Sequence, residues 1–377
     1  MRNERAYQVC SRCVMDTTVS DIVFDSDGVC SYCTEFLDRS GHIVFKDPVL
    51  REQELARFVE RVKADGRGKR YDCVIGVSGG VDSSWALVQA VKLGLRPLAV
   101  HMDNGWNSEL AQNNIANLVR GLGVDLYTHV IDWHEYKSLM QAFFDAHVID
   151  VELLYDNAML AVNYKQASDF KVHNILAGTN QATEGLYIPQ DWNWFKYDRK
   201  NIESLASNYG KIKIKTFPAM GTLDLIIYSY FKKIKWVSFL DYLEYNKFES
   251  LNFLEENYGY KRYPYKHYES VFTRFYQGYI LPKKFHVDKR RVHLSTLVIS
   301  GQMTRNDAVC QLKDIPYPSE SALDDDIQYF LKKMGWSRDQ LDHYINTPGI
   351  RHDHYPSEKK LWDFALKFYR HFMKKNK

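Results

Sequence analysis

The sequence predicts an α/β protein with a doubly wound parallel sheet, an N-terminal cysteine ribbon and a mostly helical C-terminal region. Three observations support this fold class. Short apolar runs alternate with helical stretches between residues 71 and 178, which is typical of a parallel sheet. Two C-x2-C pairs lie near the N-terminus, and the segments after residue 220 are interpreted as mostly helical.

Pattern changes along the chain indicate four regions. The stretch Arg51–Gly68 has helical periodicity and ends in glycines, so it is interpreted as a linking helix. Low-complexity tracts and internal repeats are absent from the sequence. The expected regions are a ribbon over 1–45, the linking helix over 46–70, an α/β domain over 71–220 and a mostly helical substrate- or partner-binding region over 221–377.

The composition is that of an ordinary soluble globular protein. The 377 residues are 45% hydrophobic and 26% charged, with a net charge of +3. This near balance argues against nucleic acid as a partner. The start, residues 1–8, has no apolar core, and no apolar run reaches the roughly 18 residues of a membrane helix. We therefore expect a cytoplasmic protein with no nucleic-acid or membrane partner.

Four cysteines have the spacing of a metal ribbon. Cys10 and Cys13 form one C-x2-C pair, and sixteen residues later Cys30 and Cys33 form another. Each pair aims two thiolates at one point, and two pairs complete a tetrahedron. We expect a structural Zn²⁺ site without a catalytic role, because thiolates suit zinc and a reducing cytosol disfavours disulfides. An iron–sulfur cluster and a redox pair are the alternatives.

The segment between the two pairs predicts a hairpin. Residues Ile22–Cys30 are interpreted as a strand, a turn at Asp27-Gly28 and a return strand. The two remaining cysteines, Cys73 and Cys310, stand alone and are interpreted as packing residues.

The α/β region alternates strongly between apolar strands and amphipathic helices. Ser108 is expected to cap one helix, which Gly121 would end. In such sheets ligands bind beyond the carboxyl ends of the strands. The predicted strands are Tyr71–Val77, Arg96–Met102, Asp125–Val130 and His173–Gly178, and the predicted helices are Val81–Gly94, Ser108–Gly121, 134–147 and 157–170.

The turn after the first strand has the composition of a phosphate site. In the stretch SGGVDSS, Gly79 and Gly80 allow close backbone approach to a ligand, and Ser78 and Ser83 add hydroxyl donors. The following helix N-terminus favours an anion at the same point. Asp82 fits if Mg²⁺ bridges it to phosphate oxygens. The alternative is a plain helix cap, and neither a Walker loop nor a dinucleotide fingerprint is present.

The pattern S-G-G-x-D-S resembles the PP-loop of N-type ATP pyrophosphatases, which include GMP synthetase, ammonia-dependent NAD synthetase, asparagine synthetase and tRNA-modifying enzymes. The resemblance implies that ATP is cleaved between its α- and β-phosphates and that AMP is transferred to a substrate oxygen. It implies catalytic roles for Ser78, Asp82 and Ser83. The ATP-binding residues that it implies are Ser78, Gly79, Gly80, Val81, Asp82 and Ser83, with Asp82 on Mg²⁺.

The end of the second strand supports the same family. The stretch AVHMDNGW, residues 99–106, resembles the V-D-N-G segment of GMP synthetase, which implies that Met102 and Asp103 lie at the adenine pocket. His101 is interpreted as a core residue.

The end of the fourth predicted strand also supports this family. The stretch LAGTNQATEG, residues 176–185, resembles G-T-D-x-A-x-E of NAD synthetase. This implies that Gly178 and Thr179 contact ATP and that Glu184 is a catalytic second carboxylate on Mg²⁺; without the motif, Glu184 would be a solvated loop acid. Asn180 replaces the aspartate of the pattern, so the role of this position stays open.

Across nearly its whole length the chain resembles the N-acetyl sugar amidotransferase family of the WbpG and PseA type. The most distinctive stretches are CSRCVMDTT, SGGVDSS and LSTLVISGQMTR, the last at Leu294–Arg305. The resemblance implies that an acetamido group of a sugar or sugar nucleotide becomes an acetamidino group with ATP and ammonia, in lipopolysaccharide O-antigen or flagellin-sugar biosynthesis.

The resemblance also implies a partner that supplies ammonia. An N-terminal-nucleophile glutaminase needs cysteine at residue 2, where this chain has Arg2, and Cys73 lies inside a predicted strand. We therefore expect separate glutaminase and cyclase-like subunits, which are HisH/HisF-like.

The C-terminal region offers several interpretations. Residues Tyr258–Phe285 interleave aromatic side chains with cations, which suits a sugar nucleotide, single-stranded RNA, a protein interface or a solvated face over an aromatic core. Residues Tyr230–Phe248 predict an amphipathic helix, which suits a homo-oligomer or partner surface. The cations considered for phosphate contacts are Lys261, Arg262, Lys266, Arg274, Arg290 and Arg291.

Two other functions compete with the sugar amidotransferase. A PP-loop tRNA-thiolating enzyme can also carry a C-x2-C ribbon, but thiolation usually needs further cysteines or a cluster, and this chain offers only Cys73 and Cys310. A catalytically inactive nucleotide-binding scaffold is the third class.

Overall fold

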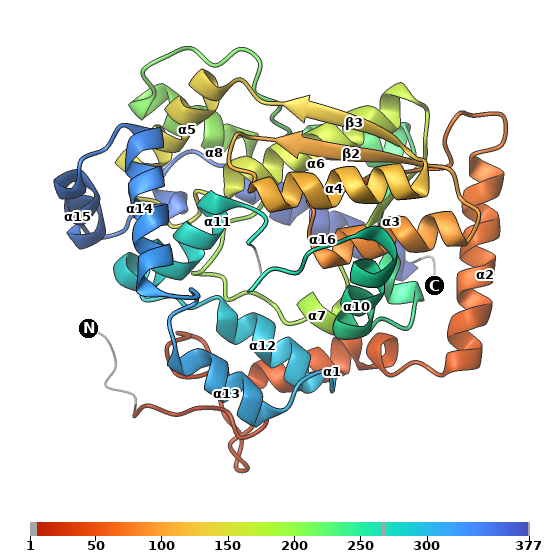
Figure 1. Ribbon diagram of the computed structural model, residues 1–377, viewed down its shortest axis with the longest axis horizontal. Coiled ribbons are helices and arrows are strands. Elements are labelled where there is room, and N and C mark those ends of the chain that lie inside the picture. The colour runs from red at the N-terminus through yellow and green to blue at the C-terminus, as the bar shows by residue number, and fades with distance from the viewer. Residues whose placement is uncertain (1–5, 265–267, 376–377) are drawn as a thin grey trace.

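A parallel sheet of five strands forms the centre of the computed structural model, which describes residues 6–264 and 268–375 (Figure 1). The strand order is β3-β2-β1-β4-β5, so the chain crosses from one side of β1 to the other after β3. This confirms the predicted doubly wound sheet. The strands are β1 (Cys73–Gly76), β2 (Pro97–Asp103), β3 (Asp125–Val130), β4 (Asn174–Ala177) and β5 (Lys235–Ser238).

The fifth strand corrects a prediction. The amphipathic helix expected over Tyr230–Phe248 is wrong, because Trp236 and Val237 pair with Ile175 and Leu176 of β4. A 3₁₀ turn, Phe239–Tyr242, follows the strand and buries its first two side chains in the core. Partly buried residues of a strand and buried residues of a 3₁₀ turn together produce an apolar spacing that resembles that of a helix.

The helices that connect the strands lie where the sequence predicts them, within a few residues. They are α3 (Val81–Lys92), α4 (Glu109–Leu122), α5 (Trp133–Asp145) and α6 (Leu153–Asp169). Ser108 caps α4 as expected, since its Oγ accepts a hydrogen bond from Ala111 N at 3.2 Å. The helix ends at Leu122, followed by Gly123 as its C-cap with φ +64°, and not at Gly121. Gly121 instead leaves room for the ring of Tyr258, which a β-carbon would approach to 2.9 Å.

Both faces of the sheet are covered. Cys73 and Ile75 of β1 point into a core layer formed with α3 and α4, whereas Val74 points into the opposite layer with α5 and α6. This alternation explains why the central strands β1, β2 and β4 are mostly apolar. Cys73 is fully buried, as predicted. Cys310 was also predicted to be a packing residue, but it is exposed, because Ala308 is the buried residue of its helix, Arg305–Lys313.

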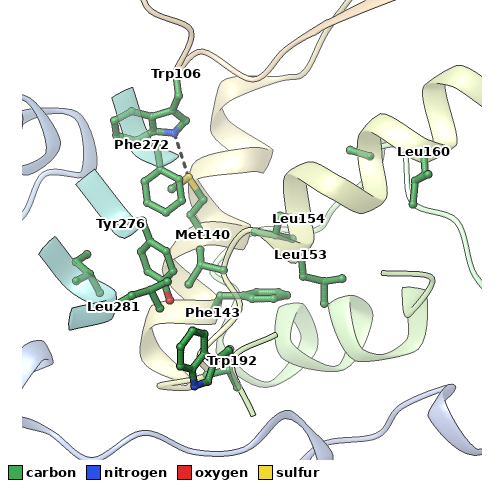
Figure 2. Close-up of a cluster of buried hydrophobic side chains, with 14 of the residues drawn as sticks. Trp106, Met140, Phe143, Leu153, Leu154, Leu160, Trp192, Phe272, Tyr276 and Leu281 are labelled. Carbon is green, nitrogen blue, oxygen red and sulfur yellow. Dashed lines mark hydrogen bonds between the residues drawn. The ribbon is translucent and has the colours of Figure 1, made fainter. Parts of the chain in front are cut away.

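The C-terminal region is mostly helical, as expected, and packs directly on the α/β part. Figure 2 shows Phe272 and Tyr276 beside Trp106 and Met140, whose Sδ accepts a hydrogen bond from Trp106 Nε1 at 3.2 Å. The other α-helices are α1 (Ser31–Val44), α2 (Pro48–Asp65), α7 (Gln181–Glu184), α8 (Arg199–Tyr209), α9 (Thr222–Ile226), α10 (Lys247–Tyr258), α11 (Val271–Phe275), α12 (Arg290–Ile299), α13 (Arg305–Lys313), α14 (Glu320–Met334), α15 (Arg338–Asn346) and α16 (Lys359–Lys375).

Shorter helical elements complete the described fold. Residues Ile227–Phe231 and Tyr276–Phe285 form π-helices, and His352–His354 forms a 3₁₀ turn. Within the described ranges, none of the helices combines the length and the apolar character needed to cross a lipid bilayer.

The N-terminal hairpin is smaller than predicted. One antiparallel bridge joins Phe24 to Cys30, and Gly28 takes φ +75° at the expected turn. The return strand is missing because α1 begins at Ser31, directly after Cys30, which is its N-cap.

Glu135 of α5 anchors the segment that precedes α9. Its carboxylate, 8% exposed, accepts hydrogen bonds from the backbone N–H groups of Lys215, Thr216 and Phe217 at 2.8 to 2.9 Å. Burial alone would raise the pKa of Glu135, but hydrogen bonds from Thr216, Lys215 and Phe217 outweigh it and lower the pKa.

Replacing Glu135 should therefore cost stability in a pH-dependent way. Glu135→Gln is expected to lower the free energy of unfolding by about 2 kcal/mol near neutral pH, because an amide replaces a charged acceptor. Since the folded pKa is lowered, this contribution is present above the unfolded pKa of about 4.3 and is lost as the pH falls further. Urea titration at neutral and acidic pH measures it. The exposed Glu52→Gln is the control, and equal losses in both variants would refute the account.

Candidate functional site

A tight turn joins β1 to α3 at the carboxyl edge of the sheet. Gly80 is the N-cap of α3, and Gly79 takes φ +84°. A β-carbon on Gly79 would lie 2.9 Å from the carbonyl oxygen of Ala111 in α4, so only glycine fits. The β1–α3 connection therefore packs against the N-terminal end of α4. The free N–H groups at the N-terminus of α3 lie on the other side of this connection.

The two serines of the turn meet each other. Ser78 Oγ and Ser83 Oγ are 3.2 Å apart, and Ser83 Oγ accepts a hydrogen bond from Ser78 N at the same distance. Gly80 N donates to Ser78 Oγ at 3.2 Å. Hydroxyl and amide donors thus gather at one helix N-terminus, where the helix dipole favours an anion.

Asp82, in the first turn of α3, is bound by residues from distant segments. Its Oδ1 accepts hydrogen bonds from Tyr245 OH at 2.6 Å, from Thr183 Oγ1 at 3.2 Å and from Asn180 Nδ2 at 3.5 Å. Asp82 is thereby tied both to α7 and to the segment that follows β5.

The structure explains why Asn180 stands where the NAD synthetase pattern has aspartate. Asn180 caps α7, since its Oδ1 accepts from Thr183 N at 2.8 Å, while its Nδ2 points toward Asp82. An aspartate here would place a second carboxylate beside Asp82, whereas the amide supplies a donor.

Glu184 lies in the same neighbourhood, at the end of α7. Burial, the charge and hydrogen bond of Asp82, and the charge of Glu184 all raise the pKa of Tyr245 well above its ordinary value. Tyr245 therefore stays protonated and remains a donor at physiological pH. The negative charges of both predicted carboxylates, Asp82 and Glu184, thus raise the pKa of the same phenol.

Gly178 and Thr179 bring the end of β4 to the turn. A β-carbon on Gly178 would lie 2.7 Å from the backbone of Asp82 and Ser83, so the two chains pass in direct contact. Thr179 is exposed, and its Oγ1 lies 3.1 Å from Ser238 Oγ of β5.

The residues predicted at the end of β2 have different surroundings. Met102 is 3% exposed and packs in the hydrophobic core. Asp103 shapes the following loop, because its Oδ1 accepts from Gly105 N at 2.8 Å and from Asn107 Nδ2 at 3.2 Å. His101 is buried, with Nδ1 2.8 Å from the carbonyl oxygen of Val77, which agrees with a structural role.

Five residues at the site were not foreseen as site residues, among them Thr183, which donates to Asp82. Besides Tyr245, the hydroxyls of Tyr260 and Tyr263 donate to the carbonyl oxygen of Gly79 at 2.9 and 3.1 Å. The carboxylate of Glu269 would lie 3.5 Å from a β-carbon on Gly80. The density of tyrosines after residue 257 was the only sequence signal for Tyr260 and Tyr263.

Two of the predicted cations in the segment Tyr258–Phe285 are held in ion pairs. Arg262 pairs with Glu255, and Arg274 with Asp326, at 2.5 and 2.6 Å. Lys261 is exposed. Lys266 lies outside the described residues.

Arg290 and Arg291 are also paired, with Asp288 and Asp16 at 2.7 and 2.9 Å. Since Asp16 belongs to the N-terminal region, Arg291 serves contacts within the chain and does not face the turn.

The four N-terminal cysteines form a metal-binding cluster. Their Sγ atoms lie within 4.8 Å of one another, and all four residues are fully buried. The Cys10–Cys33 and Cys13–Cys30 sulfur distances are 3.8 and 3.7 Å, too long for disulfides. A tetrahedral ion with metal–sulfur bonds of about 2.3 Å would separate its sulfurs by about 3.8 Å, so the cluster fits such an ion.

The comparisons with known proteins agree with the motifs. Residues 269–369 match the family described as "LPS biosynthesis protein WbpG-like, C-terminal domain". This match confirms the resemblance to WbpG-type proteins for these residues. The chain is also 37% identical over 76 residues to the glutamine-hydrolysing GMP synthase of Pyrobaculum aerophilum, a match that covers 20% of this chain and 15% of that enzyme.

Solved structures that match parts of this chain include two synthetases. The NMN synthetase of Francisella tularensis is 16% identical with a TM-score of 0.30, and the match covers 59% of this chain and 99% of that one. The NH3-dependent NAD synthetase of Campylobacter jejuni is 17% identical with a TM-score of 0.29, covering 56% and 94% of the two chains.

The close approach at Gly178 yields a stability prediction. Gly178→Ala should lower the free energy of unfolding by about 1–3 kcal/mol, because the new methyl group meets backbone atoms that cannot move aside without shifting α3. Thermal unfolding measures the loss. Gly41→Ala in α1 is the matched control, since a β-carbon there meets nothing within 4 Å. A Gly178→Ala protein as stable as Gly41→Ala would contradict the packing described.

Proposed function

We propose that the chain is an ATP-dependent amidotransferase that converts a sugar acetamido group to an acetamidino group, consuming ATP and ammonia and releasing AMP and pyrophosphate. The observation that carries the proposal is the turn at residues 78–83, whose Asp82 is bonded to α7, in a chain with a WbpG-like C-terminal domain. We place the reaction in bacterial surface-polysaccharide or flagellin-sugar biosynthesis.

The proposed ATP site lies at the N-terminus of α3. The amides and hydroxyls of the turn bind the β- and γ-phosphates, and Gly178 and Thr179 flank them, because both features meet at the same helix end. We place the adenine toward Met102 and Asp103 at the end of β2, although Met102 itself is buried.

Asp82 and Glu184 are the proposed Mg²⁺ ligands. Among the described residues, all hydrogen bonds to Asp82 go to Oδ1, so Oδ2 is the oxygen left for a cation. Mg²⁺, when bound, neutralises charge that develops on the pyrophosphate. Tyr245, Thr183 and Asn180 hold the Asp82 carboxylate in one orientation while phosphates bind.

The proposed chemistry needs no side-chain nucleophile. The amide oxygen attacks the α-phosphorus, and the bond to pyrophosphate breaks. Ammonia then attacks the imidate carbon, AMP departs and an amidine remains. The helix N-terminus, Ser78 and Ser83 stabilise the charge on the leaving pyrophosphate, so catalysis consists of positioning and electrostatics.

The remaining ligands and partners follow from the same proposal. The four cysteines hold a structural Zn²⁺, because a closed set of four thiolates leaves no open position for a substrate. Separate glutaminase and cyclase-like subunits supply the ammonia, and the region from residue 221 contributes to sugar and partner binding.

Incubation with ATP, ammonium and candidate UDP-diacetamido sugars tests the function. The expected products are AMP, pyrophosphate and a sugar in which NH replaces oxygen, identified by mass spectrometry. Release of ADP, or thiolation of tRNA in place of sugar amidination, would refute the proposal.

Asp82→Asn should reduce pyrophosphate release at least about 100-fold, because the site loses the charge that holds Mg²⁺. A coupled pyrophosphate assay measures the rate. Asp325→Asn, at an exposed aspartate of α14, is the control and should match the wild type. Full activity of Asp82→Asn would remove Asp82 from the catalytic machinery.

Tyr245→Phe isolates the strongest hydrogen bond to Asp82. The variant keeps the ring and loses the 2.6 Å bond, so kcat/KM for ATP should fall about tenfold, a loss of about 1.4 kcal/mol. Tyr242→Phe, whose ring stacks on Phe58, is the control. Equal kinetics for both variants would show that Tyr245 does not position Asp82.

A further inference from the structure

We propose that the four-cysteine metal site holds α7 in place, so that metal binding and ATP binding strengthen each other. The inference rests on the proposed ATP site. It assigns to Arg305, far from that site, a positioning role. Figure 1 shows the arrangement: α7 lies between α3 on one side and α12 and α1 on the other.

The first pair of cysteines is fixed to the C-terminal helices. Arg305, the first residue of α13, donates from Nη2 to the carbonyl oxygen of Cys10 at 2.9 Å and from Nε to that of Cys13 at 3.1 Å. One guanidinium group therefore spans the backbone of the whole C-x2-C turn.

The residues after this turn are fixed to α12. Val14 N donates to Ser295 Oγ at 3.2 Å, and Arg291 donates to the carbonyl oxygen of Val14 at 2.8 Å. The buried Val14 side chain packs with Leu294 and Ala308. The first cysteine turn and α12 thus move as one unit.

The second pair of cysteines is built into α1. Cys30 is the N-cap of α1, and Cys33 lies in its first turn. Farther along α1, Ser40 Oγ donates to Gln181 Oε1 at 2.6 Å, and Arg39 donates to the same oxygen at 3.0 Å and to the carbonyl oxygen of Gly185. The helix that starts at the metal site therefore holds both ends of α7.

The C-terminal end of α7 also touches α12. Leu186 N donates to Thr296 Oγ1 at 3.3 Å, and Thr296 is the neighbour of the serine that bonds Val14. A helix as short as α7 has little stability of its own. Its position, and with it the Thr183–Asp82 hydrogen bond, depends on α1 and α12.

The metal ion joins these two supports. Each close pair of sulfurs, Cys10–Cys33 and Cys13–Cys30, contains one cysteine from the first C-x2-C turn and one from the second. An ion bound to all four sulfurs therefore fixes α1 relative to α12, and loss of the ion frees the two helices to shift. Because coupling between two sites is reciprocal, bound nucleotide must in turn retain the metal.

Metal release in the presence of nucleotide tests the coupling. Zinc-loaded full-length protein is mixed with the chromogenic chelator 4-(2-pyridylazo)resorcinol, with and without α,β-methylene-ATP and magnesium. We expect the nucleotide to slow zinc release at least about fivefold in the wild type. In Arg305→Ala the nucleotide should change the release rate less than about twofold, because the first cysteine turn loses its hydrogen bonds to α13, which packs against α12.

Arg290→Ala is the matched control. Arg290 lies on α12 and, like Arg305, donates to backbone carbonyls, but those belong to Gln311 and Asp314 and not to the cysteine turns. Coupling should persist in this variant. If circular dichroism shows that Arg305→Ala is unfolded, Gln181→Ala takes its place, since it removes the hydrogen bonds that Arg39 and Ser40 of α1 make to the first residue of α7.

Calorimetry of α,β-methylene-ATP binding separates the two possible failures. If the nucleotide binds the wild type and leaves zinc release unchanged, the coupling is refuted and the proposed function stands. If coupling persists in both Arg305→Ala and Gln181→Ala, the described contacts do not carry it. If no nucleotide binds to the zinc-loaded protein, the proposed ATP site itself is wrong.

Discussion

One carboxylate oxygen, Oδ1 of Asp82, links the turn after β1 to α7 and to the segment that follows β5. It accepts hydrogen bonds from Tyr245, Thr183 and Asn180, which come from two segments that lie about 100 and 160 residues further along the chain. A carboxylate in a partly buried position needs such donors, because its charge is costly to desolvate. The turn at the end of β1 therefore has its shape only when β4, α7 and the segment after β5 are in place.

Much of this fold could be predicted because local chemistry determines it. Buried parallel strands are short and apolar, so they stand out in the sequence. Ser108 caps its helix through a local hydrogen bond that does not depend on tertiary contacts. The spacing of the four cysteines specifies a tetrahedral cluster. The fifth strand could not be predicted, since Trp236 and Val237, both only partly buried, join the sheet by pairing with β4, a contact that no local pattern encodes.

The site was predictable only where a motif marks it. The predicted site residues lie in two motifs, residues 78–83 directly after β1 and residues 178–184 directly after β4. Tyr245 and Glu269 reach the site through tertiary packing, and neither belongs to a recognisable pattern. The role of Asn180 became clear only from its contact with Asp82. The stretch LSTLVISGQMTR, distinctive in sequence but without an evident purpose, proves to hold the first cysteine turn.

The contact between Arg305 and Cys10 joins residues separated by 295 positions. A ribosome adds about 5 to 20 residues per second, so the cysteines emerge roughly 15 to 60 seconds before the arginine that covers their backbone. During that interval Val14 has no apolar neighbours from α12 and α13. The first cysteine turn is thus made long before the helices that cover it, and a chain that terminates before residue 290 leaves this turn exposed to chaperones and proteases.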